Sequence, residues 1–258
     1  MQCRIAFLVA LSLLTSACGS ANSKSSSELI SGNWQMNLVP TRGKVTIISQ
    51  SGFLLQNDNV IIGSMFLGYP SCTGVGSVAG SISGTNIEFT VDLAGLTVNL
   101  SGALGSDQAS MSGAYDILVS GCQGSETNTP PETGSWTANL VKPLNGNFQG
   151  TFMSKSLQTL LPVTGQVTQG QNTGLSDTSL TGNLSISGYC FTGANISGLV
   201  SGTNVVIFLA DPSGVQIGQV MGTSTVDGTS VTGTYEILPQ GSTKACSDGD
   251  HGEVALTL

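Results

Sequence analysis

Apolar and polar residues alternate along most of the chain. In the stretch IEFTVDL, residues 87–93, every second side chain is apolar and the side chains between them are polar. The same period of two returns over residues 96–100, 111–117 and 231–237. This period is typical of strands with one buried face. Outside the N-terminal apolar run we find no helical periodicity, so the pattern predicts an all-β protein.

The sequence contains two copies of one unit. Four segments recur in the same order: GNWQ (from residue 32) as GNFQ (from 146), SCTGVGSVAGSISGTN (71) as YCFTGANISGLVSGTN (189), MSGAYDIL (111) as VTGTYEIL (231), and GSWTANL (134) as GEVALTL (252). The offset between Cys72 and Cys190 is 190 − 72 = 118 residues. The repetition indicates a tandem duplication with two domains, residues 30–140 and 146–258, joined by the short segment VKPLN.

Each copy is expected to form a closed barrel. The stretches of sequence between turn residues suggest about eight strands per copy. The connections between them are short, which favours antiparallel pairing of neighbouring strands. The last strand of the first copy, GSWTANL, can pair beside its first strand, GNWQMNL, and so leave no free edge. We therefore predict two antiparallel meander β-barrels, with two β-sandwiches as the alternative. Glycines inside strands predict the bends that closure requires: Gly80, Gly113, Gly198 and Gly233.

The Gly-x-Trp opening of the first strand, Gly32 to Trp34, resembles the first strand of lipocalins and avidins. The resemblance covers three residues, and the second copy has Phe148 in place of tryptophan. It implies a meander barrel, which in lipocalins carries a small apolar molecule. Trp34 and Trp136 stand on the predicted first and last strands of the first copy. We expect them to fill the barrel, with a ligand cavity that both line as the alternative.

The N-terminus resembles the signal of bacterial lipoproteins. A short positive start precedes the apolar run IAFLVALSLL, which is too short to span a bilayer. Ser16-Ala17-Cys18 then resembles the lipobox, although Thr15 stands where leucine is usual. The resemblance implies a signal peptide over residues 1–17 and acylation, such as by palmitate, on Cys18. The alternative is an ordinary secretory signal with an incidental cysteine.

Residues 18–29 then read as a lipidated, Ser-rich tether. Several acyl chains on one residue would attach the protein stably to a membrane. In lipoproteins of enteric type, aspartate after the cysteine retains the protein at the inner membrane, and Gly19 occupies that position here. In a Gram-negative host the resemblance therefore implies a cell-envelope location at the outer membrane.

Four of the six cysteines occupy equivalent places in the two copies. Cys3 would leave with the signal and Cys18 would carry lipid. An even set in an exported protein indicates disulfides. Of three connectivities, Cys72–Cys122 with Cys190–Cys246 keeps each bridge inside one copy. We expect no metal at these cysteines, because they lack the Cys-x-x-Cys pairing of zinc sites.

Charge and composition limit the binding and catalytic functions that we expect of the protein. The net charge is −8, and only seven Lys and Arg residues are present, so nucleic-acid binding is not expected. The single histidine, His251, has no marked serine partner for a hydrolytic triad. Asp248, Asp250 and Glu253 loosely resemble part of a calcium loop, but later ligands of that motif are missing. We interpret them as a solvated acidic turn.

Two pairs of carboxylates occupy equivalent places in the copies, Asp92 with Asp211 and Asp116 with Glu236. Paired carboxylates can serve glycoside hydrolysis. Each of these alternates with apolar neighbours, so we expect all four to face outward into solvent.

These observations predict a lipid-anchored envelope protein that is not an enzyme and has no cofactor. Its role would be binding or structural, through loops at the barrel ends. Its partners would be the membrane, reached by the acyl chains on Cys18, and either a small apolar ligand or an envelope protein. The alternative function is a lipocalin-like carrier that holds a small apolar molecule inside a barrel.

Overall fold

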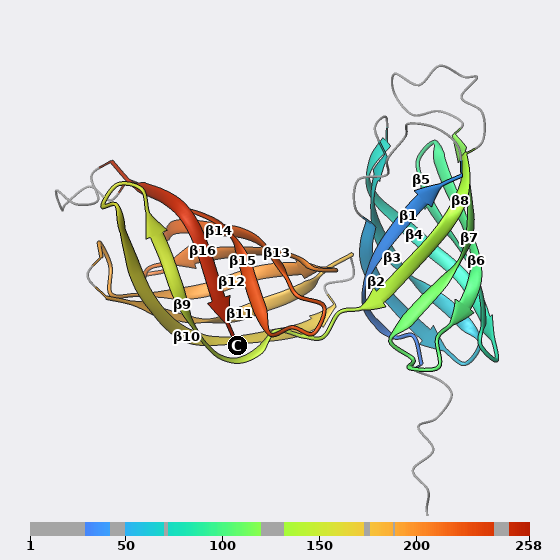
Figure 1. Ribbon diagram of the computed structural model, residues 1–258, viewed down its shortest axis with the longest axis horizontal. Coiled ribbons are helices and arrows are strands. Elements are labelled where there is room, and N and C mark those ends of the chain that lie inside the picture. The colour runs from blue at the N-terminus through green and yellow to red at the C-terminus, as the bar shows by residue number, and fades with distance from the viewer. Residues whose placement is uncertain are drawn as a thin grey trace, which may run out of the picture.

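The computed structural model describes residues 29–41, 50–69, 72–119, 132–172, 176–187, 189–239 and 248–258. These residues form two β-barrels joined by a short connection (Figure 1). Their sixteen strands account for all the regular secondary structure of the described residues. No described residue belongs to a helix that is long and apolar enough to cross a membrane.

Barrel 1 is a closed antiparallel meander in which each strand pairs with its neighbours in sequence. Its strands are β1 (Gly32–Pro40), β2 (Gln50–Asn57), β3 (Val60–Tyr69), β4 (Cys72–Ser83), β5 (Asn86–Leu93), β6 (Leu96–Leu104), β7 (Ser110–Val119) and β8 (Glu132–Leu140). The barrel closes where β8 pairs with β1, with Trp136 opposite Leu38. The predicted pairing of the last strand beside the first is confirmed.

Barrel 2 repeats this topology. Its strands are β9 (Asn145–Ser154), β10 (Thr159–Asn172), β11 (Thr178–Ile186), β12 (Gly193–Ser201), β13 (Asn204–Ala210), β14 (Gln216–Ser224), β15 (Ser230–Ile237) and β16 (Asp250–Thr257). Closure comes from β16 and β9, with Val254 opposite Phe152. The prediction of two tandem meander barrels is therefore confirmed, and the sandwich alternative is wrong.

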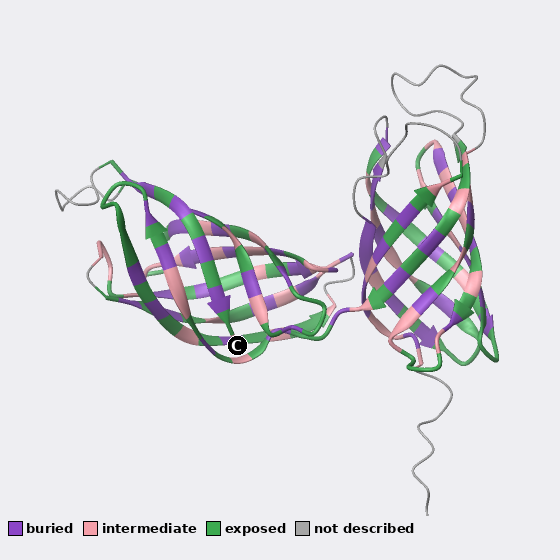
Figure 2. Cartoon of the chain, in the orientation of Figure 1, coloured by how far each residue is buried: buried purple, intermediate pink, exposed green. Residues whose placement is uncertain are grey.

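Buried and exposed residues alternate along the strands, as the coloured bands of Figure 2 show. In β5, Ile87, Phe89 and Val91 are buried, while Glu88 lies outside. Each barrel has its own apolar core, one containing both tryptophans and the other built around Phe148, Phe152 and Tyr235. The alternation thus gives each closed sheet a filled interior.

Two pairs of glycines face each other across neighbouring strands. Gly102 pairs with Gly113 across β6 and β7, and Gly222 pairs with Gly233 at the matching place in barrel 2. A β-carbon on Gly113 would overlap the carbonyl oxygen of Ser101, and one on Gly233 would overlap that of Met221. Adjacent strands therefore approach closely at these points only because neither has a side chain there.

The two ends of each barrel differ. Each has an even number of strands, so the chain enters and leaves at the same end, which we name the linker rim. The opposite end, where β7 is joined to β8 and β15 to β16, we name the tyrosine rim. The linker itself is short and covered: Val141 and Leu144 are buried, and the Lys142 N–H donates to the Val226 carbonyl at 2.8 Å.

The linker rim of barrel 2 is seated against the wall of barrel 1 (Figure 1). Asn33 of β1 donates from Nδ2 to the Gly202 carbonyl at 2.9 Å and accepts from the Gly202 N–H at 2.6 Å. Beside it, Gln35 Oε1 accepts from the Thr203 N–H at 3.1 Å. Side chains of β1 thus hold the β12–β13 turn, and the contact between the two barrels at this place consists of hydrogen bonds between polar groups.

Candidate functional site

The tyrosine rim of each barrel carries a tyrosine bonded to a carboxylate. In barrel 2 the Tyr235 hydroxyl donates to Asp250 Oδ2 at 2.6 Å. In barrel 1 the Tyr115 hydroxyl donates to Glu132 Oε1 at 2.8 Å. The positions are equivalent, because Asp250 lies opposite Ile237 and Glu132 lies opposite Ile117. The duplication has therefore preserved a polar pair at this rim.

A glycine makes room for each tyrosine ring. Gly134 lies opposite Tyr115 and Gly252 lies opposite Tyr235. A β-carbon on Gly134 would stand 2.6 Å from the Tyr115 ring, and one on Gly252 would stand 3.1 Å from the Tyr235 ring. The ring can therefore lie across the neighbouring strand and carry its hydroxyl to the carboxylate.

Asp250 is the centre of the barrel 2 site. Besides Tyr235, its carboxylate accepts from the Tyr189 hydroxyl at 2.8 Å and from the Ser156 N–H at 3.0 Å. The side chain is 4% exposed. The expectation that Asp250 belongs to a solvated acidic turn is therefore wrong, because donors from three other segments enclose it. Asp248 and Glu253 do lie exposed, as expected.

The hydrogen bonds decide the charge of this cluster. Burial acts to raise the pKa of Asp250, but the tyrosine hydroxyls and the main-chain N–H outweigh it and hold that pKa well below its usual range. Burial, together with the bond to Asp250, raises the pKa of Tyr189 and Tyr235 far above the ordinary tyrosine value. Asp250 is thus an ionised acceptor and both tyrosines are protonated donors.

Aromatic rings surround this carboxylate. Phe152 stacks on Tyr235 with ring centroids 4.4 Å apart, and Tyr189 meets Phe191 edge-on at 5.5 Å. Tyr189 and Phe191 are partly buried and pack against the apolar core of barrel 2, to which Phe152 and Tyr235 belong.

A cavity of about 590 Å³ opens outside this rim, along the outer face of β15 and β16. Glu236 lies opposite His251 in the ladder, and Thr234 lies opposite Glu253. Four carboxylates, one histidine and one lysine line the cavity: Glu236, Asp248, Asp250, Glu253, His251 and Lys155. No group of three or more metal-ligating side chains with suitable geometry occurs among the described residues. The cavity is therefore an acidic recess beside an aromatic rim.

Barrel 1 lacks this set of side chains. In the matching ladder, Asp116 lies opposite Thr133 rather than a histidine, and Ala114 lies opposite Ser135 rather than a glutamate. His251 and Glu253 are thus features of the second copy alone. The sequence already showed that His251 has no counterpart, but not that it borders a cavity.

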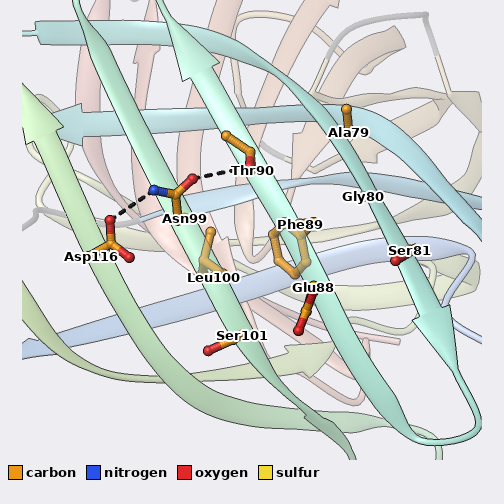
Figure 3. Close-up of a pocket in the computed structure, with 10 residues that line it drawn as sticks. All are labelled: Ala79, Gly80, Ser81, Glu88, Phe89, Thr90, Asn99, Leu100, Ser101 and Asp116. Carbon is orange, nitrogen blue, oxygen red and sulfur yellow. Dashed lines mark hydrogen bonds between the residues drawn. The ribbon is translucent and has the colours of Figure 1, made fainter.

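A second hollow, of about 380 Å³, lies on the outer wall of barrel 1 over β4 to β7. Figure 3 shows Asn99 between Thr90 and Asp116 on three neighbouring strands. Thr90 Oγ1 donates to Asn99 Oδ1 at 3.2 Å, and Asn99 Nδ2 donates to Asp116 Oδ2 at 2.8 Å. In barrel 2, Gln219 donates to Glu236 at the same place, at 3.1 Å.

Asp92, Asp116 and Glu236 lie on strands, on the outer face of the barrels as expected. Asp211 instead follows the end of β13, so it does not occupy the place of Asp92, which in barrel 2 belongs to Ala210. Asp92 accepts from Thr97, and Asp211 caps its own turn through Ser213 and Val215. No two of the four form the facing pair that glycoside hydrolysis would need, since each bonds to neighbours on its own wall.

Both tryptophans lie in the core of barrel 1, with Trp34 0% and Trp136 1% exposed. The Trp34 indole N–H donates to the Ile30 carbonyl at 2.8 Å, and that of Trp136 is shared between the carbonyls of Ser101 and Ala114 at 3.1 Å. Phe89 meets Trp136 edge-on. Each indole donor is thus satisfied by main chain and is not offered to a ligand.

Cys72 and Cys190 are both disulfide-bonded. The partners expected for them, Cys122 and Cys246, lie outside the described residues, as does Cys18. The pairing within each copy therefore stays a prediction.

Two solved structures match this chain over most of its length, at low sequence identity. Kievitone hydratase from Nectria haematococca is 8% identical, with 94% of this chain and 93% of that chain covered and a TM-score of 0.24. A protein assigned as AttH from Nitrosomonas europaea is 11% identical, with 87% of this chain and 91% of that chain covered and a TM-score of 0.24. No protein-family model and no curated protein sequence matches the chain.

The expectation that the protein is not an enzyme is corrected by this comparison. One of the two matched structures, kievitone hydratase, is an enzyme by its name. The exclusion is withdrawn, and at a TM-score of 0.24 the match assigns no activity to this chain.

Proposed function

We propose that the protein is a lipoprotein of the cell envelope, acylated on Cys18, that binds a small cationic ligand in the recess at the tyrosine rim of barrel 2. In a Gram-negative host its membrane would be the outer membrane. The single observation that carries the binding role is the cavity of about 590 Å³ along β15 and β16. Concave sites with a few convergent polar groups are the usual places for small ligands.

The chemistry of the recess favours a cation. Glu236 and Glu253 are exposed on its wall, and Lys155 is the one basic residue among its lining side chains apart from His251. The exposed carboxylates can approach a positive group, while Tyr235 and Asp250 supply a rigid floor. The interior of barrel 1 is filled by the two tryptophans, which favours a site outside the barrel over a lipocalin-like interior site.

The binding role is tested by native mass spectrometry of protein isolated from its own host. A small-molecule adduct is expected on the wild type. Calorimetric titration with spermidine, as a probe cation, should give binding that the double variant Glu236→Gln/Glu253→Gln weakens by about tenfold or more. Asp92→Asn removes one exposed charge far from the recess and should bind as the wild type does. Equal binding by all three proteins would contradict the proposal.

The anchor is tested separately. Cys18→Ser should abolish fatty-acid labelling and release the protein from membranes. Membrane retention of an unlabelled wild type, unchanged in the variant, would contradict acylation at Cys18.

A further inference from the structure

The wall of barrel 1 is divided by charge. The four strands β1 to β4 contain no acidic or basic residue. The other four strands contain Glu88, Asp92, Asp116 and Glu132. Strands β9 to β14 of barrel 2 also contain no acidic or basic residue, so the lack of charge permits contact with an apolar surface but does not by itself mark this face.

Apolar side chains project from this uncharged half at the linker rim. Leu55 is 43% exposed, Val60 is 49% exposed and Ile62 is 50% exposed, with both barrels in place. Leu55 lies opposite Ile62 in the β2–β3 ladder, and Val60 follows the turn of the same hairpin. These three side chains, which we name the apolar patch, therefore form one outward cluster.

A groove of about 470 Å³ continues the patch toward barrel 2. Phe53, Leu55, Ile62 and Val75 line it from barrel 1, and Asn172 lines it from barrel 2. No charged residue lines this groove. The uncharged surface thus extends from the linker rim of barrel 1 to the junction of the barrels.

The chain enters the fold beside the patch. Gln56, next to Leu55 in β2, accepts from the Ile30 N–H at 3.3 Å, and the Gln56 N–H donates to Ser31 Oγ at 2.9 Å. Leu29 lies against the same β2–β3 turn. The first described residues are therefore held next to the β2–β3 hairpin, which carries the apolar patch.

The length of chain before this point limits where barrel 1 can go. Cys18 and Leu29 are separated by 29 − 18 = 11 residues. A chain of this length reaches at most about 40 Å. If Cys18 is anchored in lipid, the linker rim and the apolar patch stay within that distance of the membrane surface.

We propose that the apolar patch rests on the lipid surface, so that barrel 1 is held against the membrane at Leu55, Val60 and Ile62 as well as through Cys18. This inference rests on the proposed anchoring. The absence of charge on β1 to β4 suits zwitterionic lipid, since nothing there would attract anionic head groups, and Asp58 in the adjoining turn would be repelled by them.

A second copy of the chain fits the patch less well. A stable protein interface buries about 800 Å² on each partner. Three half-exposed aliphatic side chains supply much less than this. A membrane needs no matching shape, and each apolar group that reaches the acyl boundary adds to attachment.

The test places the protein on vesicles without relying on natural acylation. A histidine tag replaces residues 1–18, and the protein is bound to phosphatidylcholine vesicles that contain a nickel-chelating lipid. Hydroxyl-radical footprinting then measures side-chain oxidation. Oxidation of Leu55, Val60 and Ile62 should fall by about threefold or more relative to protein free in solution. Leu118 and Met221, which are 47% and 52% exposed elsewhere, should be unchanged.

A matched pair of variants supports the footprint. Leu55→Glu/Ile62→Glu should lower the imidazole concentration that releases the tagged protein by about threefold, because charge opposes burial in lipid. Leu118→Glu/Met221→Glu adds the same charge away from the patch and should release as the parent does. Oxidation that changes by the same ratio between vesicle-bound and free protein at all five side chains, or equal release of both variants, overturns the proposal.

The outcomes separate this proposal from the others. Protection of the patch that grows with protein concentration and needs no vesicles would assign it to a second copy and overturn membrane contact. Loss of acylation at Cys18 in the host would overturn the proposed anchor, whereas the tagged protein would still show whether the patch meets lipid.

Discussion

Asn33 and Gly202, which are 169 residues apart, are joined by two hydrogen bonds that use both the donor and the acceptor of the Asn33 amide. Gly202 has a φ of +56°, in the left-handed region, and a β-carbon there would overlap the Gln35 side chain. The contact between the barrels therefore depends on a glycine turn that fits a side-chain amide. This contact holds barrel 2 against barrel 1 through the main chain of the β12–β13 turn.

Asn33→Ala should loosen the pair of barrels. It leaves the Gly202 N–H and carbonyl without these partners, at a cost of about 2 kcal/mol in the coupling between the barrels. Small-angle X-ray scattering should show a broader distribution of distances within the molecule. Asn37→Ala, at an exposed position of the same strand, should scatter as the wild type does. Identical scattering from both variants would mean that the linker and the remaining contacts, such as that between Gln35 and Thr203, are enough to orient the barrels.

Asp250→Asn should destabilise barrel 2 by about 2–4 kcal/mol at neutral pH, because a neutral amide cannot accept the same charge-assisted bonds. Thermal unfolding measures the change. Asp92→Asn, at an exposed position with one hydrogen bond, should shift stability by less than about 1 kcal/mol. A neutral effect at Asp250 would show that the cluster around it contributes little.

The pH dependence of stability follows from the same site. The folded-state pKa of Asp250 is lowered, so its contribution is complete above its ordinary pKa of about 4 and is lost as pH falls below that value. Tyr189 and Tyr235 have raised pKa values, so their contribution is complete below about pH 10 and is lost as pH rises through the higher folded-state values. Urea unfolding at several pH values should show both losses, and Asp250→Asn should reduce them.

Gly113→Ala and Gly233→Ala should each destabilise their barrel, by about 2–4 kcal/mol. In both cases the new methyl group meets main chain of the facing strand, which cannot move without opening the ladder. Gly74→Ala is the matched control in a strand, because its β-carbon would meet only the end of the Leu93 side chain, at 3.2 Å. Chemical denaturation of the three variants should separate them.

Peptide mapping under non-reducing conditions should recover Cys72 linked to Cys122 and Cys190 linked to Cys246. Each bridge would close a long loop, of 122 − 72 = 50 residues in the first copy. Its removal by a double serine variant should lower stability by up to about 4 kcal/mol. A peptide that joins Cys72 to Cys190 would contradict the assignment.

The fold could be predicted because its determinants are local. Alternation in β5 places Ile87 inside and Glu88 outside with no knowledge of other strands, and the repeated segments show that one solution is used twice. The pairing of β8 beside β1 followed from the need to cover two free edges. Glycines such as Gly113 could be singled out inside strands, but the glycine that faces Gly113 in the ladder could not.

The candidate site could not be predicted in the same way. Asp250 reads as part of a polar turn, and its burial depends on Tyr189, 61 residues away, and on Ser156, 94 residues away. Neither partner is marked by spacing or motif. The uncharged half of barrel 1 was present in the sequence, but a whole-chain count of charges hides it, because the acidic residues of β5 to β8 enter the same sum.

The even strand number of each barrel has a consequence for how this architecture can diversify. The chain enters and leaves each barrel at the linker rim, so the connections at the tyrosine rim do not join one barrel to the other. The segment between β7 and β8 can therefore lengthen, and the one between β15 and β16 can acquire new residues such as His251 at its border, without moving the neighbouring barrel. The two copies can therefore acquire different functions at the tyrosine rim while both keep the same barrel fold.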